Sequence, residues 1–527
     1  MKKAFLIILS LILININSRA QKEGLASIKK ENLKSHMEFF ASDEMKGREF
    51  GTDANEIAAL YLKTNIQRMG LKPGAGDYFQ HMPIAMVKSS VKESYLRVSD
   101  DSGRLLSSTD SILQILPVTT ALEAEGRLVF AGFGYEDSTS GYSDLKGIDV
   151  KDKIVMLMTR TPEMAKNNVA GDMIMFQVEM EKIERLMQKG AKAFIFVFDP
   201  GHIVKDPFNS IYYGISKEGQ VVAGDGKYQG FPFILDFIRS PLADKLLAPT
   251  GKTIKQYYDE IVTSGKTAAV EIPGIMLSLK SALERTEFDG KNVLGIVEGS
   301  DPILKNECIV YTAHFDHVGE NAKGEVYNGA DDDASGSVAL LELAKAFSSL
   351  KTRPLRSVVF AWVNGEEKGL IGSEYYVKNP AIPLEKTLLD INLDMVGRTW
   401  TPADTGKFYG MDMDVTKPGE VLMYTKHESS ELMKMINSSA VLTSMKVIDK
   451  GDDIEAGGSD HESFWAKGVP AVMFHTGIHA DVHQVSDDEA KIDYDKMEQI
   501  TKMVFHLGYT VANRRERFVV EKRPEEE

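Results

Sequence analysis

The second half of the chain alternates between short apolar runs and longer segments in which apolar residues recur at helical spacing. The apolar runs predict strands at 293–297, 308–313, 356–363, 388–393 and 471–474. The segments with helical spacing predict helices at 334–348, 369–377, 429–438 and 494–512. Strands and helices that alternate in this way are typical of an α/β sandwich with a largely parallel sheet.

The middle of the chain has a different pattern of apolar and polar residues. Short apolar runs separated by Gly, Ser and Asp predict a small β-rich module at 120–275. Within it, the spacing of large apolar residues predicts one helix at 173–188, and a continuous apolar run predicts a buried strand at 191–198. Two stretches of the module, 141–155 and 188–193, resemble the protease-associated domain.

The first twenty residues differ from everything that follows. Lys2 and Lys3 precede an apolar run from Ala4 to Ile14, and a more polar stretch then ends at Ala20. This order is typical of a secretory signal peptide, so we expect cleavage after Ala20 and export to the periplasm or the medium. A membrane anchor is the alternative, but the apolar run is too short to cross a bilayer as a helix.

The composition limits the partners that the chain can have. With 527 residues, of which 43% are hydrophobic, it is typical of a soluble globular protein with more than one domain. A formal net charge of −15 argues against nucleic acid or an anionic membrane surface as a partner. The single cysteine, Cys308, excludes an intramolecular disulfide, and its place at the start of an apolar run favours a core residue over a catalytic thiol.

Ionisable residues follow four of the predicted strands, at the point where each strand ends. His314 and Asp316 follow one strand, the sequence Asn-Gly-Glu-Glu at 364–367 follows the next, and Asp394 follows the one after. Three histidines follow the last of these strands: His475, His479 and His483. Because the carboxyl ends of parallel strands face one crevice, these side chains are expected to meet there. One histidine after a strand is more often structural, but four coincident strand ends favour a functional site.

A run of three aspartates, 331–333, lies shortly after the first of these strands. Neighbouring carboxylates repel one another and no lysine or arginine lies within the run, so a divalent cation is the simplest neutralising partner. Histidine and carboxylate ligands without cysteine are typical of zinc sites that keep a position open for water. With at least five ligands available, two zinc ions that share a bridging carboxylate are favoured. Because neighbouring side chains diverge, one of Glu366 and Glu367 can bind metal while the other serves as a general base.

These residues resemble the co-catalytic di-zinc exopeptidases, the family that includes bacterial leucyl aminopeptidases, glutamate carboxypeptidases and the transferrin receptor. The resemblance covers 285–515 and extends to the leading segment at 27–115. It implies a three-layer α/β sandwich with a mixed, largely parallel sheet and an inserted protease-associated domain. The expected division is a signal peptide at 1–20, the first part of the peptidase domain at 21–119, the inserted domain at 120–275, the catalytic zinc-peptidase domain at 276–513 and a charged, solvated tail at 514–527.

The resemblance also implies roles for individual residues. It implies five metal ligands, which are His314, Asp332, Glu367, Asp394 and His483. Asp332 matches the bridging ligand, and the family implies a cis peptide between it and Asp333. Glu366 matches the general base, and Asp316 matches the carboxylate that orients the first histidine ligand. His475 and His479 stay open as alternatives for the last ligand because they lie close to His483 in the sequence.

Three further residues near these motifs have two interpretations each. His317 either supports the ligands from behind or is a structural residue. Asp460 and His461 lie in the sequence 458–464, which also matches a family segment, and they can shape the pocket. The equally good alternative is that Ser459 or Asp460 caps a helix.

The expected function is that of an exported metallo-exopeptidase acting on peptides. We expect an aminopeptidase that removes N-terminal residues with two zinc ions, a hydroxide nucleophile and Glu366 as the general base. Three alternatives remain. A carboxypeptidase would need a cation for the substrate carboxylate, for which Arg398 is the nearby candidate. A glutaminyl-cyclase-like transferase would need a single zinc, and a binding or receptor module would not need an intact ligand set.

Overall fold

The computed structural model describes residues 20–521 with the exception of 91–92, 110–113, 116–121, 168–171, 203–219, 224–232, 322, 403, 406, 409–410, 413, 427–428 and 453–457. Residues 1–19 of the expected signal peptide lie outside the described residues, and so do residues 522–527 of the expected tail. Within the described part of the chain, no helix combines the length and the apolar character that crossing a membrane requires.

The chain folds into two compact units. The first unit comprises Met1–Pro83 and Asp289–Glu527, and the second, Ile84–Phe288, is inserted between them in the sequence. The sequence pattern places these boundaries near residues 120 and 275, whereas the structure places the first one earlier and the second one later. The reason is strand pairing: β3 (Tyr95–Ser99) lies before residue 120 but pairs with β13 (Val270–Ser281) in the sheet of the inserted unit.

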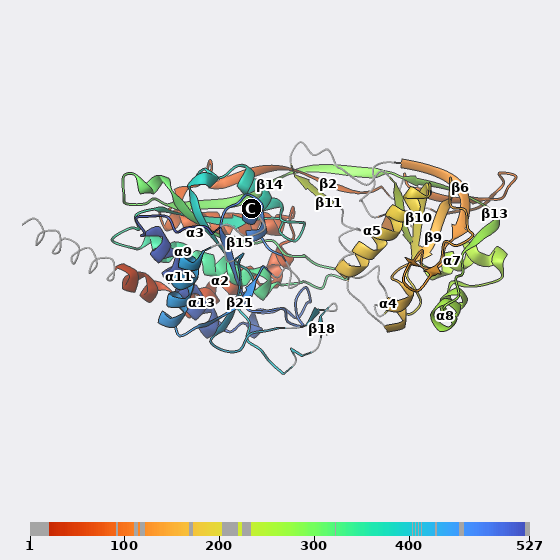
Figure 1. Cartoon of the computed structure of the whole chain (residues 1–527). Helices are drawn as coiled ribbons and strands as arrows, with labels where there is room; N and C mark the ends of the chain where they lie inside the picture. Colours follow the sequence, from red (N-terminus) through yellow and green to blue (C-terminus); the bar gives the residue numbers. More distant parts are fainter. Residues whose placement is uncertain are drawn as a thin grey trace, which may run out of the picture. The chain divides into compact units, whose positions relative to one another are not determined.

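The first unit is built around a mixed sheet (Figure 1). From β14 onward its strands are, in spatial order, β14 (Leu283–Val297), β16 (Ser357–Val363), β15 (Cys308–His314), β17 (Thr387–Leu393), β22 (Ala471–His475), β20 (Glu420–Tyr424) and β21 (Lys446–Gly451). The four neighbouring strands β16, β15, β17 and β22 are parallel, while β14 and β20 run antiparallel to β16 and β22. The carboxyl ends of four strands therefore lie at one edge.

Helices cover both faces of this sheet and make it the middle of three layers. Along β15, Ile309 and Tyr311 pack into one core while Cys308 and Val310 pack into another, because successive strand residues point to opposite faces. The first core is completed by α2 (Lys30–Phe40), α3 (Asp53–Arg68), α9 (Gly336–Ser348), α11 (Ser430–Leu442) and α13 (Tyr494–Ala512). The second core is completed by α10 (Ile371–Lys378) and α12 (His461–Trp465). The expected α/β sandwich with a mixed, largely parallel sheet is confirmed.

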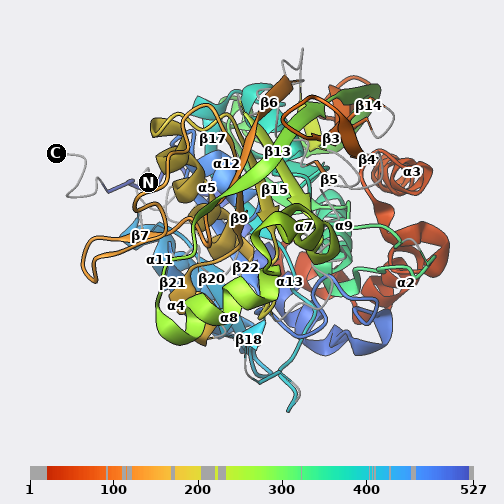
Figure 2. The ribbon, with the colours of Figure 1, turned by 90° about the vertical axis from the view of Figure 1, so that its right-hand side faces the viewer.

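The inserted unit has an eight-stranded sheet of its own. Beside β3 and β13 it contains β4 (Leu105–Thr109), β6 (Leu122–Phe130), β9 (Ile154–Met158), β10 (Ala193–Val197), β12 (Ile234–Ile238) and β5 (Gln114–Ile115). Helix α5 (Asp172–Gln188) packs on one face, and α7 (Ser240–Leu247) and α8 (Ile254–Ser264) pack on the other, as Figure 2 shows. The assignment of this unit as a protease-associated domain stays a prediction.

Further elements complete the two units. They are β1 (Lys72–Pro73), β2 (Phe79–Ser89), β7 (Glu136–Asp137), β8 (Tyr142–Ser143), α4 (Pro162–Asn167), β11 (Gln220–Ala223), β18 (Lys407–Phe408) and β19 (Met411–Asp412). The strands β2 and β14 each cross a unit boundary, so they are the places where the chain passes from one unit to the other.

The described residues of the expected tail are mostly exposed, but some of them also contact the fold. Phe518 is buried in the large core of the first unit. The guanidinium of Arg517 lies 2.9 Å from Glu307, and that of Arg514 lies 3.0 Å from Glu431. The described part of the tail is therefore anchored, because its apolar ring and its guanidinium groups all find partners.

Candidate functional site

Four parallel strands end at one edge of the sheet, and each delivers ionisable residues there. His314 is the last residue of β15, Asp394 directly follows β17, and Glu366 and Glu367 lie in the loop after β16. His483 comes from the longer segment after β22. The structure brings these residues together with Asp332, as the strand-end argument from the sequence predicts.

A first group of possible metal ligands is formed by His314, Asp332 and Asp394. The His314 Nε2 atom lies 3.3 Å from the Asp332 Oδ1 atom and 3.8 Å from the Asp394 Oδ1 atom. The Glu366 Oε2 atom lies 4.0 Å from the same nitrogen but is not a member of the group. The Glu366 carboxylate therefore lies beside the three donor residues without being one of them.

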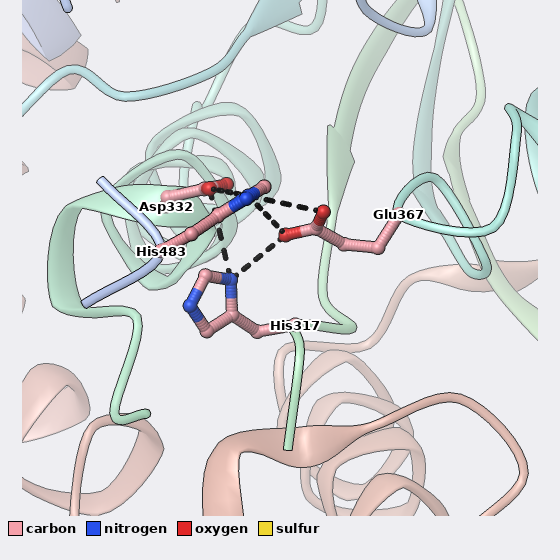
Figure 3. A group of neighbouring side chains, drawn as sticks. All are labelled: His317, Asp332, Glu367 and His483. Atoms are coloured by element: carbon pink, nitrogen blue, oxygen red, sulfur yellow. Dashed lines mark hydrogen bonds and ion pairs between the residues drawn. The ribbon is translucent and has the colours of Figure 1, made fainter. Parts of the chain in front are cut away.

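A second group is formed by His317, Asp332, Glu367 and His483 (Figure 3). The His483 Nε2 atom lies 2.9 Å from the Asp332 Oδ2 atom and 3.1 Å from the Glu367 Oε2 atom. The His317 Nδ1 atom lies 2.9 Å from the Glu367 Oε1 atom and 3.7 Å from the Asp332 Oδ2 atom. Two imidazoles and two carboxylates therefore point at one place.

Asp332 belongs to both groups, and its two carboxylate oxygens are divided between them. Oδ1 faces His314, whereas Oδ2 faces His483 and His317. The backbone N–H of Asp332 donates a hydrogen bond to the Asp487 carboxylate at 3.2 Å, which helps to fix the direction of this residue. A carboxylate placed in this way can bridge two cations.

The other two aspartates of the run point away from the two groups. Asp331 accepts a hydrogen bond from the Gly397 backbone N–H at 2.6 Å, and its second oxygen lies 3.2 Å from the His479 Nε2 atom. Asp333 accepts hydrogen bonds from the backbone N–H groups of Gly336 and Met395 at 2.8 and 3.2 Å. The peptide between Asp332 and Asp333 is cis, as the family resemblance implies. Asp331 and Asp333 are therefore members of neither ligand group, because other donors contact their carboxylates.

Asp316 contacts the neighbouring loop in addition to the histidine that it was expected to orient. Its carboxylate accepts hydrogen bonds from the backbone N–H groups of Gly365, Glu366 and Glu367 at 2.8, 3.2 and 3.3 Å. The His314 Nδ1 atom lies 3.7 Å from that carboxylate but 3.1 Å from the Asp316 backbone oxygen. The backbone carbonyl of Asp316 thus orients the imidazole, and its carboxylate positions the loop that carries both glutamates.

The two alternative histidines of the last segment lie outside both groups. The His475 Nδ1 atom accepts a hydrogen bond from the Gly477 backbone N–H at 2.8 Å. His479 pairs with Asp331 and lies 3.4 Å from the Arg398 guanidinium. Of the three histidines at the end of β22 and after it, the structure brings His483 to the ligand groups.

The segment expected as a pocket wall or a helix cap is buried close to this edge. Asp460 and His461 are both almost inaccessible to solvent, and α12 begins at His461. The Asp460 side chain makes no capping hydrogen bond to this helix, so capping by Asp460 is not the reason for its presence. Burial raises the pKa of Asp460 to about 7, and Asp316 and Asp394 contribute to the rise.

One residue that sequence reasoning missed supports the loops around the site. Arg48 is fully buried, and its guanidinium donates hydrogen bonds to the backbone oxygens of Phe315, Asn328 and Gly329 at 3.0, 2.7 and 2.9 Å. These carbonyls belong to the segments that lead to His317 and Asp332. The signal in the sequence was weak: an arginine in a glycine-punctuated loop with no periodic pattern around it.

The charges in the site attract cations strongly. Burial disfavours the charged form of His314, yet the carboxylates of Glu366, Asp316 and Asp332 raise its pKa well above the usual range. Burial also raises the pKa of Glu366 well above the usual range, and the neighbouring carboxylate of Glu367 adds to that rise. Several carboxylates that face one another in a low dielectric need positive charge between them.

The donor set and its spacing fit metal ions. Around a tetrahedral zinc with ligand distances of about 2.0–2.2 Å, ligand atoms lie roughly 3.4 Å apart. Within the two groups, the imidazole nitrogens lie between 2.9 and 3.8 Å from the carboxylate oxygens that they face. Imidazole and carboxylate donors without thiolate suit zinc. Both groups therefore have donors that suit a metal ion, and both include Asp332.

Comparison with known proteins points to the same part of the chain. Residues 292–508 match the model of peptidase family M28. The chain is 26% identical over 270 residues to Aminopeptidase YwaD of Bacillus subtilis, which covers 50% of this chain and 51% of that protein. It is 38% identical over 109 residues to leupeptin-inactivating enzyme 1 of Streptomyces exfoliatus, which covers 20% of this chain and 23% of that protein. The chain thus spans about half the length of these curated relatives or less.

Two solved structures share the fold over almost the whole chain. An aminopeptidase from Aneurinibacillus sp. strain AM-1 matches with a TM-score of 0.54 and 20% identity, covering 95% of this chain and 98% of that one. BSAP, a zinc aminopeptidase from Bacillus subtilis, matches with a TM-score of 0.53 and 18% identity, covering 94% and 98%. The ligand groups, which lie within the matched residues, agree with the family match. Residues 292–508 of this chain are therefore similar to peptidase family M28, in agreement with the zinc-exopeptidase motifs that these residues carry.

Proposed function

We propose that this chain is an exported metallo-exopeptidase that binds two zinc ions and removes N-terminal residues from peptides. The observation that carries the proposal is the position of Asp332, whose two carboxylate oxygens belong to two separate ligand groups. The partial similarity to Aminopeptidase YwaD supports the same type of reaction.

The five expected ligands divide between two metal positions. His314 and Asp394 would hold metal at the first position, Glu367 and His483 would hold it at the second, and Asp332 is a member of both groups. Two zinc ions, when bound, supply the Lewis acidity that polarises a peptide carbonyl and lowers the pKa of a water molecule.

Glu366 is the proposed general base. Its carboxylate is a member of neither ligand group and lies 4.0 Å from the His314 Nε2 atom, and the side chain keeps 15% of its surface exposed. It takes a proton from the attacking water as the new C–O bond forms. It then delivers that proton to the leaving amine nitrogen as the C–N bond breaks.

The surroundings of Arg398 favour an aminopeptidase over a carboxypeptidase. Its guanidinium donates a hydrogen bond to the Asp481 carboxylate at 2.8 Å and lies 3.7 Å from the Asp487 carboxylate. The residue is 4% exposed, so this cation is engaged inside the protein and not presented to a substrate carboxylate. The Glu366 side chain is 15% exposed, and its carboxylate suits the ammonium group of a free N-terminus.

The test is a panel of aminoacyl anilides with free and with acetylated amino groups. We expect hydrolysis of the free substrates only, because the acetyl group removes the positive charge that the site carboxylates bind. Treatment with a chelator should abolish the activity, and added Zn²⁺ should restore it. Release of C-terminal residues from N-acetylated peptides would instead identify a carboxypeptidase.

Zinc counting separates the remaining alternatives on the same preparation. A chain that holds two zinc ions and hydrolyses anilides is the proposed enzyme. A single zinc together with cyclisation of N-terminal glutamine would favour the transferase alternative, and metal-free protein without turnover would favour a binding module.

Export is the part of the proposal that rests on the leading residues alone. The charged start at Lys2 and Lys3 and the apolar run behind it support a signal peptide that ends at Ala20. Expression of the full chain in a bacterial host should therefore yield an exported protein whose first residue is Gln21. Recovery of an intact N-terminus from the cytoplasm, measured by mass spectrometry, would contradict export.

A further inference from the structure

His317 is the member of the two ligand groups to which the family motif gives no role. It follows His314 and Asp316 in the sequence His-Phe-Asp-His at 314–317. In the structure its Nδ1 atom points at the place where Asp332, Glu367 and His483 meet (Figure 3). The family motif therefore does not explain why this imidazole lies among the ligand residues.

The position of the His317 ring relative to the other ligand residues suits a metal ligand. The His317 Nδ1 atom lies 2.9 Å from one oxygen of Glu367 and 3.7 Å from one oxygen of Asp332. The ring of His483 faces the same two carboxylates, and the two ring centroids are 5.4 Å apart at an interplanar angle of 63°. Two imidazoles thus approach one point from different directions, as two ligands of a single ion do.

The residues around His317 enclose its ring closely. His317 is completely buried, and a Cβ atom on Gly329 would come within 2.4 Å of the ring, so only glycine fits opposite it. Gly329 itself has a φ of 54°, and its carbonyl oxygen accepts a hydrogen bond from Arg48. The His317 Nε2 atom is buried and has no hydrogen-bond partner among the described residues, so Nδ1 makes the polar contacts of the ring.

We propose that His317 is a fourth protein ligand of the metal at the Glu367 and His483 position. This inference rests on the proposed function, because it presumes the metal pair. The second position would then offer two imidazoles and two carboxylates, and four protein donors are the number found in closed zinc sites. The first position keeps three protein donors and an open place for water or substrate, and Glu366 lies on that side. The two metals therefore bind with unequal affinity, the second one more tightly.

Metal titration of the apoprotein against a chromogenic chelator tests this inference without any assay of turnover. The wild-type chain should bind two Zn²⁺ ions with two distinct Kd values. The variants His317→Ala and His317→Gln should both raise the lower Kd by about 10- to 100-fold or more, since removing even an outer partner of a metal ligand has an effect of that size. The weaker Kd should change little.

The glutamine variant separates a ligand from a hydrogen-bond partner. Its amide can still donate a hydrogen bond to Glu367 but is a poor zinc ligand. Wild-type affinity in His317→Gln would therefore overturn the inference and leave His317 as a structural partner of Glu367. The matched control is His475→Ala, a buried histidine outside both groups, which should keep both Kd values.

A measurement on the wild-type chain covers the case in which the variants do not fold. Zinc K-edge absorption spectra of protein loaded with one equivalent of Zn²⁺ should fit two imidazoles per zinc, from His317 and His483. A fit to one imidazole would overturn the inference while the proposed function stands. If the wild-type chain bound no zinc in the titration, the proposed function would fail instead, so the two failures are distinguishable.

Discussion

Replacement of Glu366 by glutamine is expected to lower kcat by about 10²- to 10⁴-fold, which is the range that general acid–base catalysis contributes. The glutamine keeps the shape of the side chain but cannot accept a proton. Because Glu366 is a member of neither ligand group, the variant should still contain two zinc ions per chain. The measurements are steady-state kinetics on an aminoacyl anilide and metal analysis of the same preparation.

The adjacent glutamate provides the matched control for this prediction. Glu367→Gln makes the same chemical change one residue further on, but Glu367 faces His317 and His483 at 2.9 and 3.1 Å. That variant should lose metal from the second position, whereas Glu366→Gln should not. Turnover close to that of the wild type in Glu366→Gln would refute its assignment as the base.

Replacement of Asp332 by alanine is expected to empty the first metal position. His314 and Asp394 remain there as two donors, too few to hold zinc in competition with water. Turnover should fall by about 10³-fold or more, since a metal supplies several kcal/mol of transition-state stabilisation and each 1.4 kcal/mol is a factor of ten. Metal analysis should find at most one zinc per chain, held by His317, Glu367 and His483. The additional change His317→Ala should remove that zinc as well.

The neighbouring residue Asp331 provides the control for the loss of one negative charge. Its carboxylate points away from the ligand groups and is satisfied by His479 and the Gly397 backbone N–H. Asp331→Asn should therefore keep two zinc ions if the chain folds, which circular dichroism would verify. Retention of two zinc ions in Asp332→Ala would refute the bridging role.

Much of the first unit could be predicted from periodicity because its strands are continuous apolar runs. The run Cys308–His314 is buried at every position, and a strand covered on both faces is mostly apolar, as this run is from Cys308 to Tyr311. Helices such as Tyr494–Ala512 show apolar spacing because one side of each packs on the sheet. The unit boundaries were harder to predict, because pairing between β3 and β13 joins residues far apart in the sequence.

The site could be predicted as far as it depends on strand ends. His314, Glu366, Glu367 and Asp394 follow strands that lie next to one another and run parallel, so local pattern implies their meeting. His483 lies in a longer segment with two other histidines, and nothing local distinguishes the three. The structure distinguishes them, since His475 and His479 have hydrogen-bond partners elsewhere.

The sequence by itself determined the layered α/β fold of the first unit and the kinds of side chain at its functional edge, because both follow from the order of residues along each strand. Only the tertiary structure decided the directions of side chains in loops. It turned Asp331 and Asp333 away, divided the oxygens of Asp332 between two groups and brought His317 to the second of them. Those directions depend on contacts with distant segments, such as Arg48 and Asp487, and no local pattern records such contacts.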